Sequence, residues 1–339
     1  MNSLSGIRIF SGQTGREFAM KMCDYLNVKL GDSESIKFSD GNIFVRINEP
    51  IRDKDVYLLQ PIGKDPNNEL IELLFWIDAF KRSSANSVTA IIPYFSYAKG
   101  DKKDEPRVSI RARVCADIIE TAGVDRVITM DLHSAQVQGF FKKPVDHLYA
   151  SPLLCEYFKR AGLAGNIVVV SPDAGFAKRS RDYANYLGCD VAIGDKIRTG
   201  HDENAKILKV IGDVKGKDCL VVDDFSISGG TLVDVANSLK RDGARHIYAA
   251  LSHIILNAKA VQRIEESPIE LLVTTDTVHC PEAAASKKIR VVSAAPLFAE
   301  TIRLMHERKP VGYMFTHIPE SVLQSSFSQQ ISLDSLGND

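Results

Sequence analysis

The stretch Cys219-Leu-Val-Val-Asp-Asp-Phe-Ser-Ile-Ser-Gly-Gly-Thr231 decides the fold of this 339-residue chain. It begins with apolar residues only, which predicts a strand that is buried on both faces. Asp223 and Asp224 end that strand, and a loop of small residues then opens a helix at about Gly230. A buried strand that passes through a short loop into a helix is the unit of a parallel α/β sheet.

The same alternation of apolar strand and amphipathic helix continues outward from this stretch in both directions. The predicted strands are Ile7–Ser11, Val56–Gln60, Val88–Pro93, Val127–Leu132, Ile167–Ser171, Val191–Gly194, Cys219–Val222, His246–Leu251, Glu270–Thr274 and Ile289–Ser293. The predicted helices are Gly15–Leu26, Asn67–Arg82, Ser109–Thr121, Pro152–Arg160, Ala174–Leu187, Gly230–Asp242 and Pro296–His306. Apolar strands that alternate with helices predict mostly parallel sheets covered by helices on both faces.

This pattern occurs twice, so the sequence predicts two tandem α/β domains, each a mostly parallel sheet flanked by helices. We place the domains at residues 1–148 and 149–306. Residues 319–339 are rich in Ser and Gln and poor in apolar side chains, which is typical of a flexible tail.

Composition and short motifs exclude several classes of function. A formal net charge of −1 argues against nucleic acid and membrane surfaces as partners. The chain has no apolar run of membrane-spanning length, and residues 1–10 are too short and polar for a signal peptide. The six cysteines form no CxxC pair, so we expect reduced thiols and a cytoplasmic protein. Neither a P-loop motif nor a GxGxxG after a strand occurs, so a nucleotide must be held by another device.

The loop after Asp224 is a candidate phosphate site. Its backbone N–H groups and the dipole of the following helix favour an anion, and Ser226, Ser228 and Thr231 add hydroxyl donors. Asp223 and Asp224 then lie where a sugar diol would sit, and carboxylates can also help to hold Mg²⁺. The alternative is that the two carboxylates only end a strand in solvent or cap the helix.

Two further strand ends carry groups that could bind a metal. His133 follows the predicted strand Val127–Leu132, and Asp173 follows Ile167–Ser171. Together they could approach one Mg²⁺, with phosphate oxygens and water completing its shell. The alternative for Asp173 is a cap on the helix after it.

Lys196 and Arg198 are separated by one residue, so extended backbone would direct both side chains to one face. Two cations aimed at one point suit a transferring phosphoryl group, whose equatorial oxygens gather negative charge. Surface pairs of this kind are common, so the signal is weak by itself.

The turn Phe38–Asn42 and the aromatic, charged loop within Ile92–Pro106 are candidates for nucleotide binding. Aromatic rings stack on purines, and Asp40 can accept a hydrogen bond from an amino group of the base. Ordinary packing is the alternative for the aromatic residues of the loop.

Together these segments resemble the family of PRPP (5-phosphoribosyl 1-diphosphate) synthetases, or ribose-phosphate pyrophosphokinases. The resemblance runs from about Ile7 to about His317 and keeps the spacing of FSDG, IPYFSYAKGDKK, TMDLHS, QVQGFF, PVDHLYASPLL, VVVSPDAG, VIGDVKGK and VVDDFSISGGT. It implies two phosphoribosyltransferase-like domains, with residues 307–318 returning to the first. It also implies a homo-oligomer built from dimers, such as a hexamer, whose active site lies between domains and borrows the FSDG turn from a neighbouring subunit.

The reaction that the resemblance implies is transfer of the β,γ-diphosphate of Mg-ATP to O1 of ribose 5-phosphate, with AMP leaving and no covalent enzyme intermediate. For the nucleotide it implies Phe38, Asp40, Asn42, Lys99, Gly100, Asp101 and His133. For ribose 5-phosphate it implies Asp223, Asp224, Ser226, Ile227, Ser228, Gly229, Gly230 and Thr231. His133 and Asp173 would serve the metal, and Lys196 and Arg198 would stabilise the transition state.

The chain departs from the family pattern at both substrate sites. Asn42 stands where a Glu is usual, and Lys99-Gly100 stands where Arg-Gln is usual. Lys lacks the bidentate fork of Arg, so these changes put nucleotide selectivity and affinity in doubt. Ile227 and Ser228 replace an Asp and a Thr of the ribose loop, a change that we expect that site to survive.

A second set of departures concerns regulation by phosphate and ADP. At the positions of serines that line the family's regulatory site, this chain has Pro50, Ala135, Pro310 and Gly312, while Arg52 and Gln138 remain. An anion pocket without donors loses solvation and gains little in return. We therefore expect weak or absent activation by phosphate and weak inhibition by ADP.

Two other functions stay open at this stage. A phosphoribosyltransferase, which consumes PRPP, usually has one such domain, whereas the pattern here is doubled. A catalytically weak regulatory homologue of PRPP synthetase would be expected to lose its catalytic residues, whereas this chain keeps them.

Overall fold

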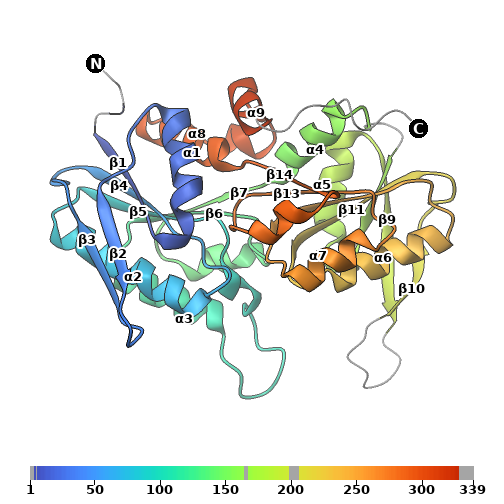
Figure 1. The fold of residues 1–339 in the computed structure, drawn as a ribbon, viewed down its shortest axis with the longest axis horizontal. Coiled ribbons are helices and arrows are strands. Elements are labelled where there is room, and N and C mark those ends of the chain that lie inside the picture. Colours follow the sequence, from blue (N-terminus) through green and yellow to red (C-terminus); the bar gives the residue numbers. More distant parts are fainter. Residues whose placement is uncertain (1–3, 5, 164–166, 198–205, 328–339) are drawn as a thin grey trace. The chain divides into compact units, whose positions relative to one another are not determined.

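The computed structural model describes residue 4 and residues 6–163, 167–197 and 206–327, and it divides into two compact units (Figure 1). Unit 1 comprises Met1–Tyr149, Thr277–His279 and Ala295–Thr316. Unit 2 comprises Ala150–Asp276, Cys280–Ala294 and His317–Asp339. The predicted fold class, two α/β domains with mostly parallel sheets, is confirmed.

Unit 1 is built on a five-stranded parallel sheet with the strand order β1-β4-β5-β6-β7. Its strands are β1 (Ile7–Ser11), β4 (Asp55–Leu59), β5 (Ser87–Ile92), β6 (Arg126–Met130) and β7 (Val145–Leu148), and β2 (Ser33–Lys37) and β3 (Ile43–Ile47) form a separate antiparallel hairpin. Its helices are α1 (Arg16–Leu26), α2 (Pro66–Arg82), α3 (Arg111–Thr121) and α8 (Ala295–His306), with 3-10 turns η1 (Gln13–Gly15), η2 (Ser96–Lys99), η3 (Ala135–Phe140) and η5 (Gly312–Phe315).

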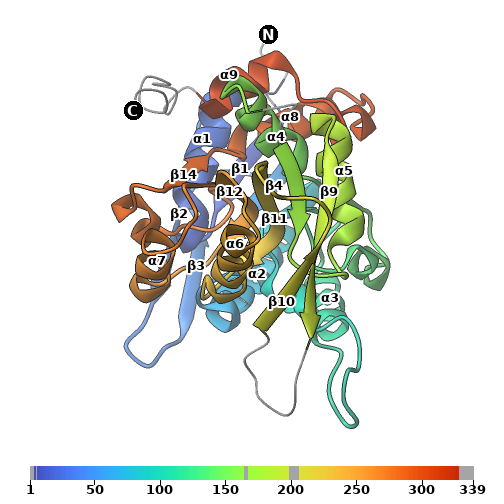
Figure 2. The ribbon, with the colours of Figure 1, turned by 90° about the vertical axis from the view of Figure 1, so that its right-hand side faces the viewer.

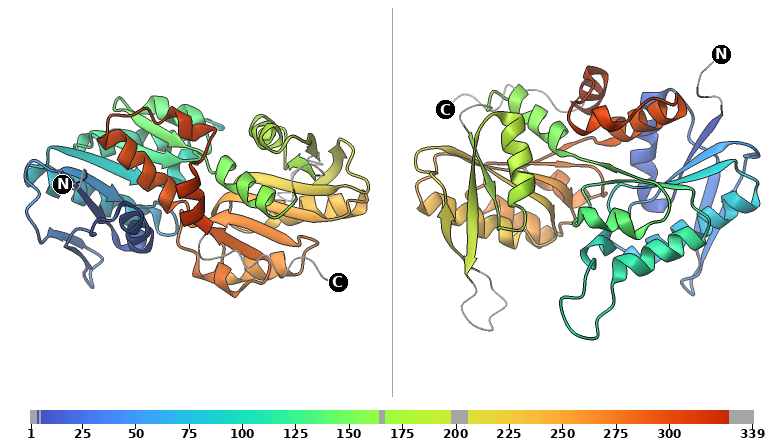
Figure 3. Two further views of the ribbon diagram at one scale, coloured as in Figure 1. Left: turned by 90° about the horizontal axis from the view of Figure 1, so that it is seen from above. Right: turned by 180° about the vertical axis from the view of Figure 1, so that it is seen from behind.

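Helices α2 and α3 cover one face of this sheet, and α1 and α8 cover the other (Figures 1 and 3). The apolar side chains of α2 recur every third or fourth residue, and Leu70, Leu73, Ile77 and Phe80 are therefore buried together against the sheet.

The second domain does not extend to residue 306 as we predicted. Ala295–Thr316 belong to unit 1, where α8 packs against α1. Phe298 is fully buried there, and its ring meets that of Phe18 edge-on with the centroids 5.5 Å apart.

Unit 2 is built on a seven-stranded sheet with the order β10-β9-β8-β11-β12-β13-β14, in which only β9 and β10 pair antiparallel. The strands are β8 (Ile167–Ser171), β9 (Asp190–Ile197), β10 (Lys206–Ile211), β11 (Asp218–Ser226), β12 (Ile247–Ile254), β13 (Leu271–Thr275) and β14 (Ile289–Val292). The helices are α4 (Ser151–Arg160), α5 (Ala177–Leu187), α6 (Gly230–Arg241), α7 (Ala258–Glu265) and α9 (Glu320–Phe327), with one 3-10 turn, η4 (Pro281–Ala285).

The direction of winding reverses between β8 and β11 in the middle of this sheet. The chain runs from β8 through α5 to β9 on one side, and from β11 through α6 to β12 on the other. Right-handed crossovers then put α5 on one face and α6 and α7 on the opposite face, as Figures 2 and 3 show. Ligands of open α/β sheets bind beyond the carboxyl ends of the strands at such a reversal.

The prediction of a flexible tail is wrong for its first part, because Glu320–Phe327 form α9. The few apolar residues of this segment lie on one helical face, and Val322, Leu323 and Phe327 are buried. The ring of Phe327 lies 6.2 Å from that of Tyr157. Residues 328–339 lie outside the described residues.

None of the helices in the described part of the chain combines the length and the apolar character that crossing a bilayer would require.

Candidate active site

Acidic side chains gather where the sheet of unit 2 reverses. Asp223 and Asp224 lie near the carboxyl end of β11, which continues to Ser226, beyond the predicted end at Val222, and Asp173 follows the neighbouring strand β8. Asp224 is 4% exposed, and Asp223 is partly buried. Burial of its carboxyl group and repulsion from Asp224 raise the pKa of Asp223 well above its usual range, and the charge of Asp173 adds to the rise. The arrangement therefore favours hydroxyl donors or a cation.

Backbone N–H groups between β11 and α6 donate hydrogen bonds to nearby serine hydroxyl oxygens. The N–H of Gly229 donates to Ser226 Oγ (3.1 Å), and the N–H of Gly230 donates to Ser228 Oγ (3.3 Å). A guanidinium nitrogen of Arg263 donates to the carbonyl oxygen of Ser228 (3.0 Å). The predicted residues of this loop thus lie together at the N-terminus of α6, with the side chain of Ile227 exposed.

Asp173 makes a capping contact, as its alternative interpretation predicted. Its Oδ1 accepts a hydrogen bond from the N–H of Phe176 (3.1 Å), in the turn that leads into α5. The same carboxylate is close enough to Asp223 to contribute to the shift in that residue's pKa. Capping of α5 therefore explains the hydrogen bond of Asp173 Oδ1. It does not explain why the carboxylate also lies near Asp223.

Strand β9 brings the backbone of Lys196 to the same end of the sheet. Ile193 of β9 is in register with Ser171 of β8, so residue 196 lies beyond the end of β8, near the level of Asp173. Residue 196 pairs with Ile207 of β10. Arg198 lies outside the described residues.

Gly194 fixes how closely β9 approaches the turn that carries Asp173. A Cβ atom at position 194 would lie 2.8 Å from the carbonyl oxygen of Pro172, which is too close for real atoms. Position 194 therefore requires glycine unless the backbone of β9 or of the turn moves.

Gly194→Ala is expected to destabilise the protein by about 1–3 kcal/mol, because the added methyl group forces two backbone segments apart. Thermal or urea unfolding measures the effect. Gly139→Ala is the matched control, since no atom lies within 4 Å of the Cβ position there. Equal stability of the two variants would disprove the proposed contact.

The turn between β2 and β3 holds itself together through its polar side chains. Asp40 Oδ1 accepts from the N–H of Asn42 (2.9 Å), and Asn42 Oδ1 accepts from the N–H of Ile43 (2.9 Å). The Phe38 side chain is 49% exposed at the tip of the hairpin. Asp40 and Asn42 are exposed as well, so all three predicted nucleotide residues of this turn are accessible to a ligand.

The aromatic loop after β5 packs mainly inward. Tyr94 and Phe95 are buried, so the packing alternative holds for both. The hydroxyl group of Tyr97 donates to Asn67. Lys99 ends η2 and leads into Gly100, whose carbonyl oxygen accepts from the N–H of Ala112 (3.1 Å).

His133 is exposed just beyond β6. The turn before it contains Asp131, which has φ +40° and whose N–H donates to the carbonyl oxygen of Leu148 (3.1 Å). Sequence reasoning missed the buried His147, whose Nε2 accepts from the N–H of Leu132 (2.9 Å). Gln138 Nε2 lies 3.0 Å from the other ring nitrogen of His147 and also donates to the carbonyl oxygen of Ala135. Gln138 is therefore engaged within its own unit.

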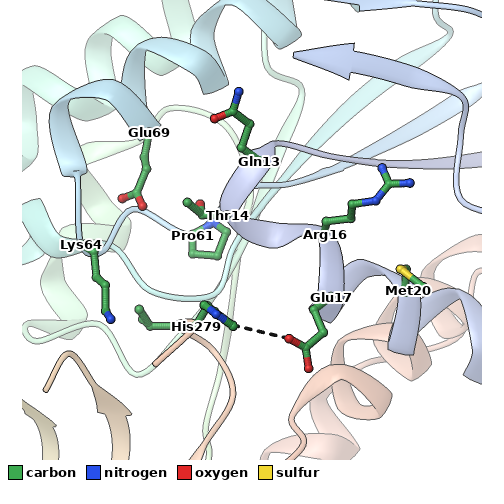
Figure 4. A pocket seen from close by; sticks show the side chains of 10 residues that line it. Gln13, Thr14, Arg16, Glu17, Met20, Pro61, Lys64, Glu69 and His279 are labelled. Atoms are coloured by element: carbon green, nitrogen blue, oxygen red, sulfur yellow. Dashed lines mark ion pairs between the residues drawn. The ribbon is translucent and has the colours of Figure 1, made fainter. Parts of the chain in front are cut away.

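A hollow of about 460 Å³ lies beside η1 and the start of α1 in unit 1 (Figure 4). Its lining residues are Gln13, Thr14, Arg16, Glu17, Met20, Pro61, Lys64, Glu69, Val278 and His279, and no predicted site residue is among them. His279 Nδ1 lies 3.5 Å from a carboxylate oxygen of Glu17, and the buried Glu69 accepts from the N–H of Gly63 (2.6 Å). Burial raises the pKa of Glu69. The predicted chemistry thus lies elsewhere.

Two family models match the chain. The N-terminal domain of ribose phosphate pyrophosphokinase matches residues 7–123, and the phosphoribosyl synthetase-associated domain matches residues 197–316. The ribose-phosphate pyrophosphokinase of Caldanaerobacter subterraneus subsp. tengcongensis is 45% identical over 312 residues, which cover 92% of this chain and 98% of that protein. The enzyme of that name from Campylobacter jejuni is 43% identical, with 92% and 100% covered.

Among solved structures, the phosphoribosylpyrophosphate synthetase from Mycobacterium smegmatis is similar to this chain with a TM-score of 0.84 and 38% sequence identity. The match covers 90% of this chain and 100% of that one. Both units therefore have counterparts in a single known fold.

Proposed function

Because the chain belongs to the ribose-phosphate pyrophosphokinase family, we propose that it transfers the β,γ-diphosphate of Mg-ATP to O1 of ribose 5-phosphate, giving PRPP and AMP. The observation that supports this most directly is the sequence of elements at the reversal of the unit 2 sheet. There a mostly buried strand carries Asp223 and Asp224 near its carboxyl end, and a serine- and glycine-containing loop leads into α6.

Ribose 5-phosphate would bind at this strand end. Its phosphate takes the place of the serine oxygens that now accept from the N–H groups of Gly229 and Gly230. The freed hydroxyl groups of Ser226 and Ser228, with that of Thr231, then donate to the phosphate. The ring hydroxyl groups donate to Asp223 and Asp224, which relieves the repulsion between the two carboxylates.

The nucleotide would bind to residues of unit 1. The exposed ring of Phe38 stacks on adenine, with Asp40 and Asn42 beside it in the turn. Lys99, Gly100, Asp101 and His133 lie along the phosphates. This assignment depends on the residue-by-residue resemblance.

Transfer would be a direct displacement at the β-phosphorus by O1, so that no residue needs to form a covalent bond. Lys196 and Arg198 neutralise the charge that gathers on the phosphoryl oxygens in the transition state. The protein contributes mainly by positioning both substrates and by supplying positive charge.

Mg²⁺ fits the donor set of this chain. No group of three or more His, Cys, Asp or Glu side chains among the described residues is arranged to hold a metal by itself. A magnesium ion that takes most of its ligands from substrate phosphates and water needs only one or two protein groups, for which we propose His133 and Asp173. When bound, Mg²⁺ neutralises phosphate charge.

The proposal is tested by AMP release from Mg-ATP and ribose 5-phosphate, without any nucleobase present. Turnover supports the synthetase, and it excludes a phosphoribosyltransferase, which would need PRPP and a base. No turnover with ATP or another nucleoside triphosphate, from folded protein, would favour a regulatory homologue.

We expect AMP formation to need no added phosphate and to resist ADP acting away from the nucleotide site. The serines at the regulatory positions are replaced, and Gln138 is engaged with His147 and Ala135. Initial rates in a phosphate-free buffer, with phosphate then titrated in, measure this. A steep phosphate requirement that Arg52→Ala abolishes would contradict the prediction.

We further propose that the chain forms a homo-oligomer built from dimers. Light scattering of the purified protein measures the mass directly. A monomer that remains fully active would contradict this proposal.

A further inference from the structure

Gly100 is buried beneath the side chain of Arg111, the first residue of α3. A Cβ atom at position 100 would lie 2.7 Å from Nε, 2.9 Å from Cβ and 3.3 Å from Cζ of Arg111. The contact includes the base of the Arg111 side chain as well as its flexible end. Arg111 therefore occupies the space that any other residue at position 100 would need.

The guanidinium group of Arg111 is exposed, and within the described part of the chain it makes no hydrogen bond or ion pair. Arg113, two positions later, instead pairs with Asp117 and donates to the carbonyl oxygen of Phe140. Burial raises the pKa of Tyr97, and the charge of Arg111 opposes that rise, so the guanidinium group also lies near η2. The aliphatic part of the Arg111 side chain thus packs over Gly100, while its guanidinium group is exposed and can bind a ligand.

We infer that Arg111 is a nucleotide-binding residue of this chain, whose guanidinium group holds phosphate oxygens of ATP beside Lys99. The inference rests on the proposed function, which assigns Lys99 and Gly100 to the nucleotide. A guanidinium group can hold a phosphate through two parallel N–H donors, whereas the Lys99 ammonium acts as a point charge. Glycine at position 100 is what permits an arginine from another segment to reach this loop.

Two substitutions should therefore weaken nucleotide binding by different routes. Arg111→Ala removes the guanidinium group, and Gly100→Ala displaces it while keeping its charge in the chain. We expect each to raise the KM for ATP by about 10-fold to 100-fold, the effect typical of losing a charged hydrogen bond. The KM for ribose 5-phosphate should not change, and Arg111→Lys should recover part of the loss.

The double variant distinguishes displacement of Arg111 from general damage to the loop. Once Arg111 is alanine, a methyl group at position 100 has no guanidinium group left to displace, so the two effects on the KM for ATP should not add, although the Cβ of residue 111 still lies close to that methyl group. Arg107→Ala is the matched control, because it removes the same charge from the exposed segment that leads to α3. The dissociation constant of ADP, from calorimetry on the full-length chain, provides a readout that needs no turnover.

An unchanged KM for ATP and an unchanged ADP affinity in folded Arg111→Ala would overturn the inference and leave the proposed function intact. An equal loss in Arg107→Ala would also overturn it, by showing that overall charge is what matters. If the natural chain binds ADP but releases no AMP, the proposed function fails. Loss of that ADP binding in Arg111→Ala would then still support the inference.

Discussion

Replacing Lys196 by Ala is expected to lower kcat for AMP formation by about 100-fold to 1,000-fold and to leave the KM for ribose 5-phosphate nearly unchanged. Strand β9 carries residue 196 past the end of β8, to the level of the turn with Asp173. A cation there would interact with charge that develops on the phosphoryl oxygens only as the bond to AMP breaks, so its loss affects the transition state more than the bound substrates.

Steady-state kinetics with both substrates varied separates an effect of Lys196 on the transition state (kcat) from an effect on substrate binding (KM). Lys209→Ala is a suitable control, because Lys209 lies on the adjacent strand β10 opposite Asp195 and has an exposed side chain. A variant at position 196 that keeps its kcat but binds ribose 5-phosphate poorly would show that Lys196 binds the ground state instead.

Asp223→Asn should stabilise the free protein at neutral pH and lower kcat/KM for ribose 5-phosphate by about 10-fold to 100-fold. The loss arises because an amide is a poorer acceptor for the sugar hydroxyl groups than a carboxylate. The gain arises because burial and the neighbouring Asp224 raise the pKa of Asp223, so that its ionisation opposes folding. The folded state holds this proton more tightly than the unfolded chain, so stability falls as pH rises above the unfolded value of about 3.9.

Thermal unfolding of the variant and the natural chain across pH 4–8 tests the sign of this effect, and the difference should grow as pH rises. Asp218→Asn, at the other end of β11, is the internal comparison. A hydrogen bond from Arg245 lowers the pKa of Asp218, so ionised Asp218 stabilises the fold, and its neutral replacement should destabilise the protein at the same pH. If both substitutions changed the unfolding temperature in the same direction, this electrostatic explanation would be ruled out.

Strand–helix alternation and the acidic strand ends were readable from sequence because both depend on local composition. Buried parallel strands are continuous apolar runs, so β8 and β11 stand out, and the residues after them must lie at one edge of the sheet. Less regular elements were missed. Lys206–Ile211 form β10 although Lys interrupts the apolar pattern, and the short helices α7 and α9 have too few turns to give a clear period.

The contacts that shape the site were not predictable, because they join segments through packing. Sequence patterns indicate that Gly100 is unusual, but only the path of the chain shows that Arg111 lies over it. Likewise the hydrogen bond of His147 to Leu132, which orders the turn before His133, depends on the pairing of β6 with β7.

The position of α8 has a consequence for biosynthesis. Each unit is made of three separate segments, and unit 1 recruits Ala295–Thr316 from near the end of the chain. While a ribosome is still making unit 2, Phe18 on α1 has no Phe298 to pack against, so the first unit emerges with an apolar helix face uncovered. Unit 1 therefore completes its fold only after Ala295–Thr316 have been synthesised, and a gene fragment ending at residue 149 would encode a protein with that face exposed to aggregation.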